Sequence, residues 1–399
     1  MSAEFVPAAD VRPEVFTVRA SDHIGRGKQR GRQLRTGIES AIAGYRRYFA
    51  HLSIAEADVR SAADASFVRL QDWAPGAAEE IVAVAEGAQV PVADLMEVIA
   101  RTEIMTQAPA APTECSTLSL TRPGSSIAAQ NWDWAADFST LWHINDVGAV
   151  PGQLRHVGIA EYGMLGKIGL NEAGVGVLLN ILKHDGDGPG GVPIHMILER
   201  VLSQATTMTE ALTIIHSAET SSSSIITVVT AEEAVQVEIA NSQKRERRAG
   251  DSDSVDSDSV AEAAGESVGS RAGFLIHTNH FLHPELLPGA LELNQTSTSQ
   301  ARYAHLESKV AEAVAESKVA ETVAAGESAG VHETTADLVD LLTTAPEEAP
   351  VCCIPEPGAA YGDRSATLVT VQIDPERKRI DLAPGSPAHG LRGNRRYQL

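Results

Sequence analysis

Two short runs of sequence mark the point where the chain changes character: Thr113-Glu-Cys-Ser-Thr-Leu-Ser-Leu120 and Ala128-Ala-Gln-Asn-Trp-Asp-Trp134. The residues between them include Pro, Gly and Ser, which favour turns, so the two runs predict a pair of strands joined by a turn. Cys115 opens the first predicted strand. Asp133, flanked by two tryptophans, lies near the end of the second.

Helical spacing dominates the sequence before this hairpin. Leu34, Ile38, Ile42 and Tyr45 recur at the period of one helix face. Further helical patterns follow at 54–73, 76–86 and 92–105, and a Pro/Ala linker without periodicity covers 105–113. After Cys115, short strand-like runs surround two helical blocks. We therefore predict an α+β fold in which helices cover antiparallel sheets.

Composition excludes several classes of protein. The formal net charge of the 399-residue chain is -21, whereas nucleic acid and anionic membranes attract a basic face, so neither partner is expected. The N-terminal sequence lacks the pattern of a signal peptide, and no stretch is apolar for long enough to span a bilayer. The three cysteines form no recognisable disulfide framework. We expect a cytoplasmic enzyme.

Two segments differ in composition from the rest of the chain. Residues at about 243–270 are poor in apolar side chains and repeat Asp-Ser, and those at about 308–335 repeat Val-Ala-Glu and Glu-Ser. We expect both to be disordered insertions, with the second a loop or a solvated helix extension. The expected organisation is a mainly helical segment, 1–114, followed by a β-rich segment, 115–399.

Cys115 is the first candidate for chemistry. A free cysteine is often a small buried hydrophobic residue. Its position argues for another role, because it follows a Pro-rich linker and opens the first strand of the β-rich part. A nucleophile released by chain cleavage would lie there, since its own α-amine becomes a general base beside the thiol.

Three further residues are candidates, each with an ordinary alternative. Asp133 is either a turn aspartate or a carboxylate in an apolar setting that needs a cationic partner, such as a protonated N-terminal amine. Asn279 is either a strand-end amide or a donor to an oxyanion. Arg302 is either a solvated helix arginine or part of the site. The histidines around Asn279 lack the ligand spacing of a zinc site, so no metal or cofactor is predicted.

The ordered set of motifs resembles a known family. Cys115, Gln-Asn-Trp-Asp-Trp, Gly-Leu-Asn-Glu-Ala-Gly, His-Thr-Asn-His-Phe and Ser-x-x-Arg occur here in one order. Together they resemble the acyl-coenzyme A:6-aminopenicillanic acid acyltransferase family, the C45 cysteine peptidases of the N-terminal nucleophile (Ntn) hydrolase superfamily. The resemblance extends to an N-terminal Gly-rich helix, Gly25 to Gly31, and to a closing hairpin near the C-terminus.

The resemblance implies a four-layer αββα sandwich and autoproteolysis of the Glu114–Cys115 bond, which gives associated α (1–114) and β (115–399) chains. Cys115 would be the nucleophile in cleavage and in turnover, Asp133 would hold its free amine, and Asn279 would donate to the oxyanion. Arg302 matches the Ser-x-x-Arg motif. Glu114 departs from the pattern, because the penicillin enzyme has Gly before its nucleophile.

The leading hypothesis is a self-processing amidohydrolase or acyltransferase that acts on a small N-acyl compound through an acyl-thioester on Cys115. The alternatives are an acyl-CoA-dependent N-acyltransferase, an amidase like the bile-salt and penicillin V hydrolases, and a non-catalytic acidic binding or scaffold protein. The long helical segment before Cys115 argues against the bile-salt hydrolase type, and the Asp-Ser repeat is the feature that favours a scaffold.

Overall fold

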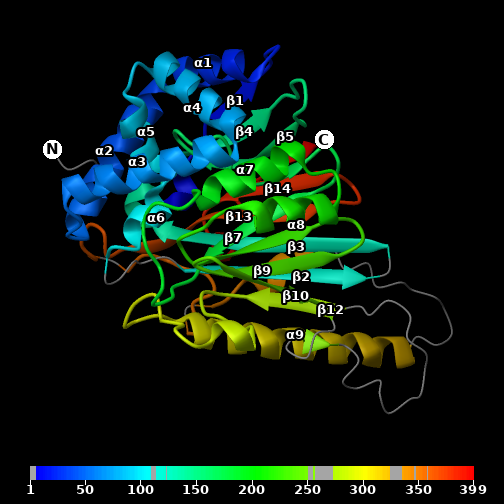
Figure 1. Ribbon diagram of the computed structural model, residues 1–399. Helices are drawn as coiled ribbons and strands as arrows, with labels where there is room; N and C mark the ends of the chain where they lie inside the picture. Colours follow the sequence, from blue (N-terminus) through cyan, green and yellow to red (C-terminus); the bar gives the residue numbers. More distant parts are fainter. Residues whose placement is uncertain are drawn as a thin grey trace.

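The computed structural model describes residues 6–108, 114–122, 124–249, 255–256, 273–323, 335–345, 347–356 and 358–399. Two sheets lie face to face, with helices on their outer faces (Figure 1). This confirms the four-layer αββα sandwich expected from the sequence. Among the described residues, no helix combines the length and apolarity that crossing a membrane requires.

One sheet has eight strands in the order β1-β4-β5-β6-β7-β8-β9-β10, antiparallel except for the parallel pair β1 and β4. Its strands are β1 (Val15–Val18), β4 (Trp142–Val147), β5 (His156–Glu161), β6 (Ile168–Asn171), β7 (Gly176–Ile181), β8 (Ser224–Val229), β9 (Ala234–Ala240) and β10 (Gln243–Arg248). The predicted hairpin at 169–176 is confirmed as β6 and β7, and Gly174 in its turn has a φ of 89°, which favours glycine.

The other sheet has seven strands in the order β11-β12-β2-β3-β13-β14-β15. Its strands are β11 (Val255–Asp256), β12 (Gly273–His277), β2 (Cys115–Arg122), β3 (Ser125–Ala135), β13 (Ser365–Asp374), β14 (Arg379–Pro384) and β15 (Arg395–Gln398). The predicted β2–β3 hairpin and the closing β13–β14 hairpin are both present. Cys115 therefore begins a central strand, between β12 and β3.

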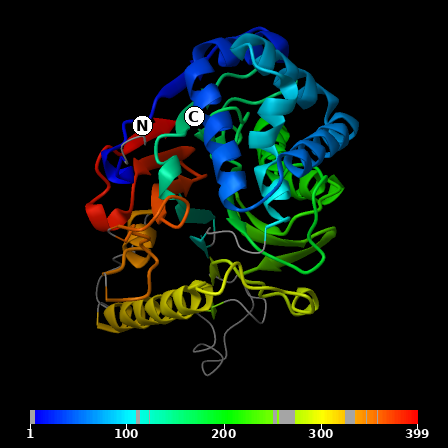
Figure 2. The ribbon, with the colours of Figure 1, turned by 90° about the vertical axis from the view of Figure 1, so that its left-hand side faces the viewer.

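The helices fall into three groups. The N-terminal group comprises α1 (His23–Gln33), α2 (Arg35–His51), α3 (Glu56–Trp73), α4 (Pro75–Ala88), α5 (Val92–Ile99) and α6 (Arg101–Met105). The eight-stranded sheet is covered by α7 (Ile194–Gln204) and α8 (Met208–Ser217), and the seven-stranded sheet by α9 (Ser299–Val323) and α10 (Thr335–Leu341). In Figure 2, α9 lies at the end of the molecule opposite the N-terminal helices.

The Gly-rich N-terminal helix packs against α4 at very short range. A Cβ at Gly31 would lie 2.1 Å from the carbonyl oxygen of Val84, and a Cβ at Gly87 would lie 2.4 Å from that of Lys28. The glycines of α1 and α4 therefore allow the two backbones to touch, which larger side chains would prevent. This contact explains why glycines recur inside a helix at this point.

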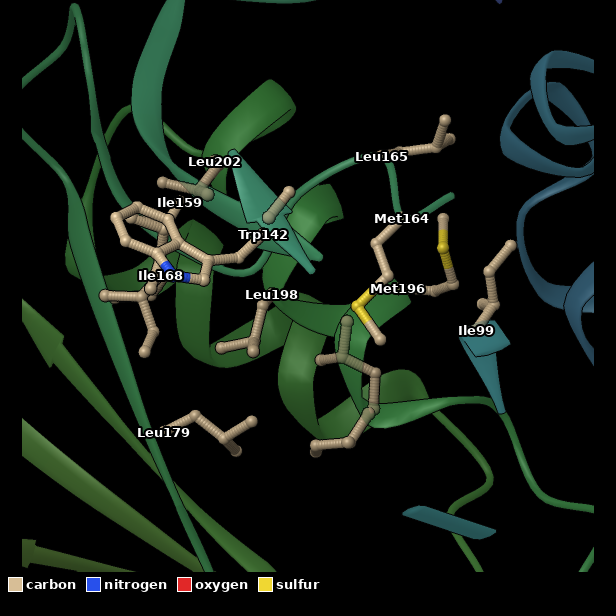
Figure 3. Packing of buried hydrophobic residues seen from close by; sticks show 14 of the residues in the cluster. Ile99, Trp142, Ile159, Met164, Leu165, Ile168, Leu179, Met196, Leu198 and Leu202 are labelled. Carbon is tan, nitrogen blue, oxygen red and sulfur yellow. The ribbon is translucent and has the colours of Figure 1, made fainter. Parts of the chain in front are cut away.

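The apolar core of the eight-stranded sheet lies beneath α7. Figure 3 shows Trp142 beside Ile159 and Ile168, with Leu198 and Leu202 of α7 packed over them. All five side chains are buried. Their burial fixes α7 on the sheet and holds the sheet that faces Cys115 in one position.

The structure corrects the boundary of the first predicted insertion. Residues 243–248 form β10, paired with β9, because their charged side chains find partners: Arg247 donates to Gln236 at 2.7 Å and Arg248 pairs with Glu233. A charged strand at a sheet edge is stable and resists further pairing. Residues 250–254 and 257–272, which hold most of the Asp-Ser repeat, lie outside the described residues, and Val255–Asp256 between them form β11.

The described part of the second predicted insertion is helical, which agrees with the helix-extension alternative. Helix α9 continues to Val323, and Leu306 and Val310 are buried against the seven-stranded sheet. Residues 324–334 lie outside the described residues. The division into 1–114 and 115–399 stays a prediction, because the N-terminal helices and β1 pack on the same sandwich as the rest.

Candidate active site

The N-terminal end of β2 brings Cys115 to the centre of a polar cluster. In the ladder with β3, Cys115 faces Trp132 and Ser116 faces Asn131. Cys115 is only 3% exposed. Its Sγ lies 3.8 Å from the backbone oxygen of Asp133. The predicted nucleophile is thus buried at the start of a central strand.

Asn279, just beyond the end of β12, holds the backbone nitrogen of Cys115. The Cys115 N–H donates to Asn279 Oδ1 at 2.7 Å, and Asn279 Nδ2 donates to the carbonyl oxygen of Ile181 at 2.9 Å. Ser299 Oγ accepts from the Asn279 backbone N–H at 2.7 Å. Asn279 therefore contacts the nitrogen of the Glu114–Cys115 peptide. Its predicted role as an oxyanion donor stays a prediction.

Arg302, in the first turns of α9, contacts both Cys115 and Asn279. Its guanidinium donates to the carbonyl oxygen of Cys115 at 2.8 Å, to Ser116 Oγ at 2.8 Å and to Asn279 Oδ1 at 2.9 Å. The side chain is fully buried. The two donors that converge on Asn279 Oδ1, from Arg302 and from Cys115, also fix the orientation of the amide.

Glu114 is held by its side chain. Its carboxylate accepts from Ser297 Oγ at 3.0 Å, from the backbone N–H of Thr298 at 2.8 Å and from the Thr298 hydroxyl. It also lies 3.4 Å from Arg302. Both residues of the predicted scissile bond are therefore anchored, Glu114 through its side chain and Cys115 through its backbone.

Asp133 lies one residue beyond the partner of Cys115 in the ladder. Its Oδ1 accepts from the Thr367 hydroxyl at 2.6 Å, while its Oδ2 has no hydrogen-bond partner among the described residues. Burial raises the pKa of Asp133 well above its usual value. Burial therefore disfavours the charged form of this carboxyl group in the intact chain. Its predicted contact with the amine of Cys115 stays a prediction.

The surroundings of Cys115 in the intact chain disfavour its thiolate form. Burial, together with the nearby Asp133, raises the pKa of Cys115 to about 12. A thiol is a much weaker nucleophile than a thiolate, so attack requires a base close to Sγ. In the intact chain the nitrogen of Cys115 is an amide and cannot serve as that base.

Asn180 is a site residue that sequence reasoning did not single out. It lies on β7, and its Nδ2 donates to the carbonyl oxygens of Cys115, His277 and Thr278 at 3.0–3.2 Å. Its Oδ1 accepts from Thr117 at 2.6 Å. The signal available in the sequence is a single asparagine in an otherwise apolar strand, Val-Leu-Leu-Asn-Ile.

The histidines near Asn279 serve the structure. His277 Nε2 lies 3.0 Å from Glu238, and the backbone N–H groups of Leu282 and His283 donate to the same carboxylate. Within the described residues, no group of three or more His, Cys, Asp or Glu side chains is arranged to hold a metal ion.

A cavity adjoins the site through Ile181, whose carbonyl oxygen accepts from Asn279. Its volume is about 180 Å³. Apolar side chains, among them Leu182 and Leu293, share its lining with polar ones such as Lys183. It has room for a small organic group, although Cys115 itself is not among the residues that line it.

A family model for acyl-coenzyme A:6-aminopenicillanic acid acyl-transferase matches residues 120–389, more than half of the chain. The chain belongs to this family. The matched residues begin after Cys115 and include Asp133, Asn279 and Arg302. Membership of the family supports acyl-transfer chemistry for the chain.

One curated protein and one solved structure illustrate what the chain is similar to. The 40 kDa form of acyl-coenzyme A:6-aminopenicillanic-acid-acyltransferase from Emericella nidulans is 30% identical over 244 residues, which are 60% of this chain and 61% of the relative. The chain thus matches less than two thirds of that protein's length. Penicillin V acylase from Agrobacterium tumefaciens superposes with a TM-score of 0.33 and 14% identity, over 68% of this chain and 82% of that one.

Proposed function

We propose that this family member is a self-cleaving Ntn amidohydrolase or acyltransferase that acts on small N-acyl compounds through a thioester on Cys115. The observation that carries the proposal is the convergence of Asn279 and Arg302 on the backbone of Cys115, beside an anchored Glu114. These contacts hold the nitrogen of the Glu114–Cys115 bond, the carbonyl of the next peptide and the Glu114 side chain, and a reaction at that bond needs such positioning.

In the proposed cleavage, Cys115 Sγ attacks the carbonyl carbon of Glu114. The S–C bond forms, the C–N bond breaks, and the thiol proton passes to the departing nitrogen. Water then hydrolyses the thioester and releases the Glu114 carboxylate, a free thiol and the α-amine of Cys115. Asn279 Oδ1 already accepts from this nitrogen, so the new amine stays next to its own thiol.

Cleavage would change the electrostatics of the site. A free α-amine has a pKa of about 7.7–8.0, so it can take the thiol proton as a general base near neutral pH. When it is protonated it offers Asp133 the cation that this buried carboxylate lacks in the intact chain. Cleavage would therefore supply both a base for Cys115 and a partner for Asp133.

In turnover, the Cys115 thiolate would attack the carbonyl of an N-acyl substrate, release the amine and leave an acyl-thioester. Water as acceptor gives hydrolysis, and an amine gives acyl transfer. The family name favours an acyl-CoA donor as the second candidate, and an assay with and without acyl-CoA separates the two. We also propose that the protein is cytoplasmic and that the two chains stay associated after cleavage.

Mass spectrometry of the purified protein tests the mechanism. We expect two polypeptides that end at Glu114 and begin at Cys115, and amidase activity that appears with them. Cys115→Ala should give one uncut, inactive chain, whereas Cys352→Ala, at a buried cysteine of another loop, should be cleaved normally. Turnover of N-acyl substrates by uncut Cys115→Ala at the wild-type rate would exclude the proposed mechanism.

A further inference from the structure

The groups that hold Glu114 form a ready-made binding site for a carboxylate. We call Ser297, Thr298 and Arg302 the carboxylate clamp. Ser297 and Thr298 donate to the Glu114 carboxylate through their hydroxyls and through the Thr298 backbone N–H. Arg302, fully buried, supplies the positive charge at 3.4 Å. The site is therefore built from side chains and already contains its ligand group.

The position of Glu114 relative to Cys115 indicates the length of acyl group that the site accepts. In self-cleavage the carbonyl of Glu114 is the acyl group that Cys115 attacks, and the clamped carboxylate is joined to this carbonyl through Cα, Cβ and Cγ. The clamp thus lies one glutaryl-length chain from the reacting carbon.

We propose that, once cleavage frees the clamp from Glu114, it binds the terminal carboxylate of a substrate acyl group of glutaryl length. The inference rests on the proposed function, and it names the substrate class: amides of a dicarboxylic acid. The substrate carbonyl takes the place of the Glu114 carbonyl beside Cys115. The Sγ–acyl bond forms, the amide C–N bond breaks, and the amine leaves with a proton. Water then hydrolyses the thioester and releases the dicarboxylic acid.

The carboxylate clamp should favour acyl chains that end in a carboxylate over neutral ones, because an unfilled clamp leaves buried polar groups without partners. A neutral acyl chain would leave the buried guanidinium of Arg302 without a negative partner. The hydroxyls of Ser297 and Thr298 would lose the carboxylate that accepts their hydrogen bonds. Sites built to hydrogen-bond a polar substrate group discriminate strongly against analogues that lack it. Arg302 keeps its bonds to Cys115 and Ser116 in either case, so the clamp stays formed when Glu114 has left.

The test compares two 4-nitroanilides that differ at one end of the acyl chain. One carries glutaric acid with its free carboxylate, and the other carries the corresponding terminal amide. Fully cleaved wild-type protein should show a kcat/KM at least ~10-fold higher for the acid. Thr298→Val and Ser297→Ala, each confirmed as cleaved by mass spectrometry, should lower this ratio chiefly by raising KM for the acid. Ser308→Ala, on the exposed face of α9, is the matched control and should keep the ratio.

Each outcome is decisive. Equal kcat/KM values for the two anilides in fully cleaved protein would overturn the inference and leave the proposed function standing. Cleaved protein that hydrolyses neither anilide, or only the neutral one, would also overturn it. An uncut chain without activity would contradict the proposed function itself, which the mass spectrum reveals before any kinetics are measured.

Discussion

Asp133 and Glu161 are both fully buried carboxylates, and they have opposite electrostatic surroundings. Glu161, at the end of β5, pairs with Arg101 at 2.8 Å and Lys167 at 2.8 Å, and it also accepts from Tyr45. Asp133 has a hydrogen bond from Thr367 and no ion pair among the described residues. The difference separates a carboxylate that stabilises the fold from one that lacks a cation in the intact chain.

The pKa values follow these surroundings. Burial by itself would raise the pKa of Glu161, but the charges of Arg101 and Lys167 outweigh it and hold the pKa well below its usual range. Burial raises the pKa of Asp133, since Thr367 and the more distant Arg302 do not compensate for it. Perturbed carboxylates of the second kind are typical of functional sites.

The two clusters meet at Trp132. Lys167 Nζ lies 3.6 Å from the centre of the Trp132 ring, and Trp132 is the ladder partner of Cys115. The Glu161 cluster therefore supports β3, the strand paired with the one that carries the nucleophile, while its hydrogen bonds run between side chains. The groups around Cys115 instead bind backbone atoms of the residue that would react.

Removing the charge of Glu161 should cause the largest loss of stability. Glu161→Gln leaves Arg101 and Lys167 buried without their counter-charge, and breaking such a pair costs about 3–5 kcal/mol. Urea unfolding of the uncut Cys115→Ala background at pH 7 measures the change. Glu39→Gln, at the exposed pair with Arg35, is the control and should change the unfolding free energy by less than about 1 kcal/mol.

The same variant tests the sign of the pH dependence. The folded pKa of Glu161 is depressed, so its contribution is fully present above the unfolded value of 4.5 and is lost as the pH falls towards the folded pKa. The difference between wild type and Glu161→Gln should therefore shrink by about 1 kcal/mol from pH 7 to pH 4. A difference that grows in acid would show that Glu161 is not an ion-paired carboxylate.

The sequence predicts the residues around Cys115 but not the cluster around Glu161. Cys115, Asn279 and Arg302 belong to motifs that keep a fixed order along the chain, so the sequence could nominate them together. The hairpin around Asp133 was predicted from strand-forming residues and turn residues. The family resemblance supplied the αββα fold, which periodicity alone could not order into sheets.

The features that the sequence does not predict depend on contacts between segments far apart in the chain. Asn180 reaches Cys115 from the opposite sheet, and Arg101 reaches Glu161 from a helix, so neither pairing leaves a local pattern. The clamp on Glu114 depends on where α9 begins. Charged residues at 243–248 looked like a disordered segment because their partners on β9 are set by pairing that composition does not reveal.

Asp133→Asn should separate cleavage from turnover. Burial raises the pKa of Asp133 well above its usual value and no cation pairs with it among the described residues, so the neutral amide is a close substitute and stability should change by less than about 1 kcal/mol. After cleavage the variant cannot supply a negative charge to the α-amine of Cys115, and kcat/KM should fall by about 10²-fold. Mass spectrometry and amidase kinetics on one preparation give both readings.

Two results would contradict this assignment. Wild-type kcat/KM in cleaved Asp133→Asn would show that the carboxylate has no part in turnover. A loss of stability as large as that of Glu161→Gln would show that Asp133 is also a charged, paired group in the intact chain, and the contrast between the two carboxylates would disappear.

Thr367→Val should give the smallest effect on kcat/KM, because it keeps Asp133 and the branched shape of the side chain, and removes only the hydroxyl that donates to Asp133 and accepts from the Cys353 backbone N–H. The hydroxyl donates to Asp133 Oδ1 at 2.6 Å, and such a bond contributes about 0.5–1.5 kcal/mol. Without it the pKa of Asp133 rises further, so the α-amine meets less negative charge and kcat/KM should fall by about 3–10-fold. Thr370→Val, on the same strand, removes a hydroxyl that donates to Gly385 instead and should leave kcat/KM unchanged. An equal loss in both variants would mean that β13 acts through strand packing, and that Asp133 is not tuned by Thr367.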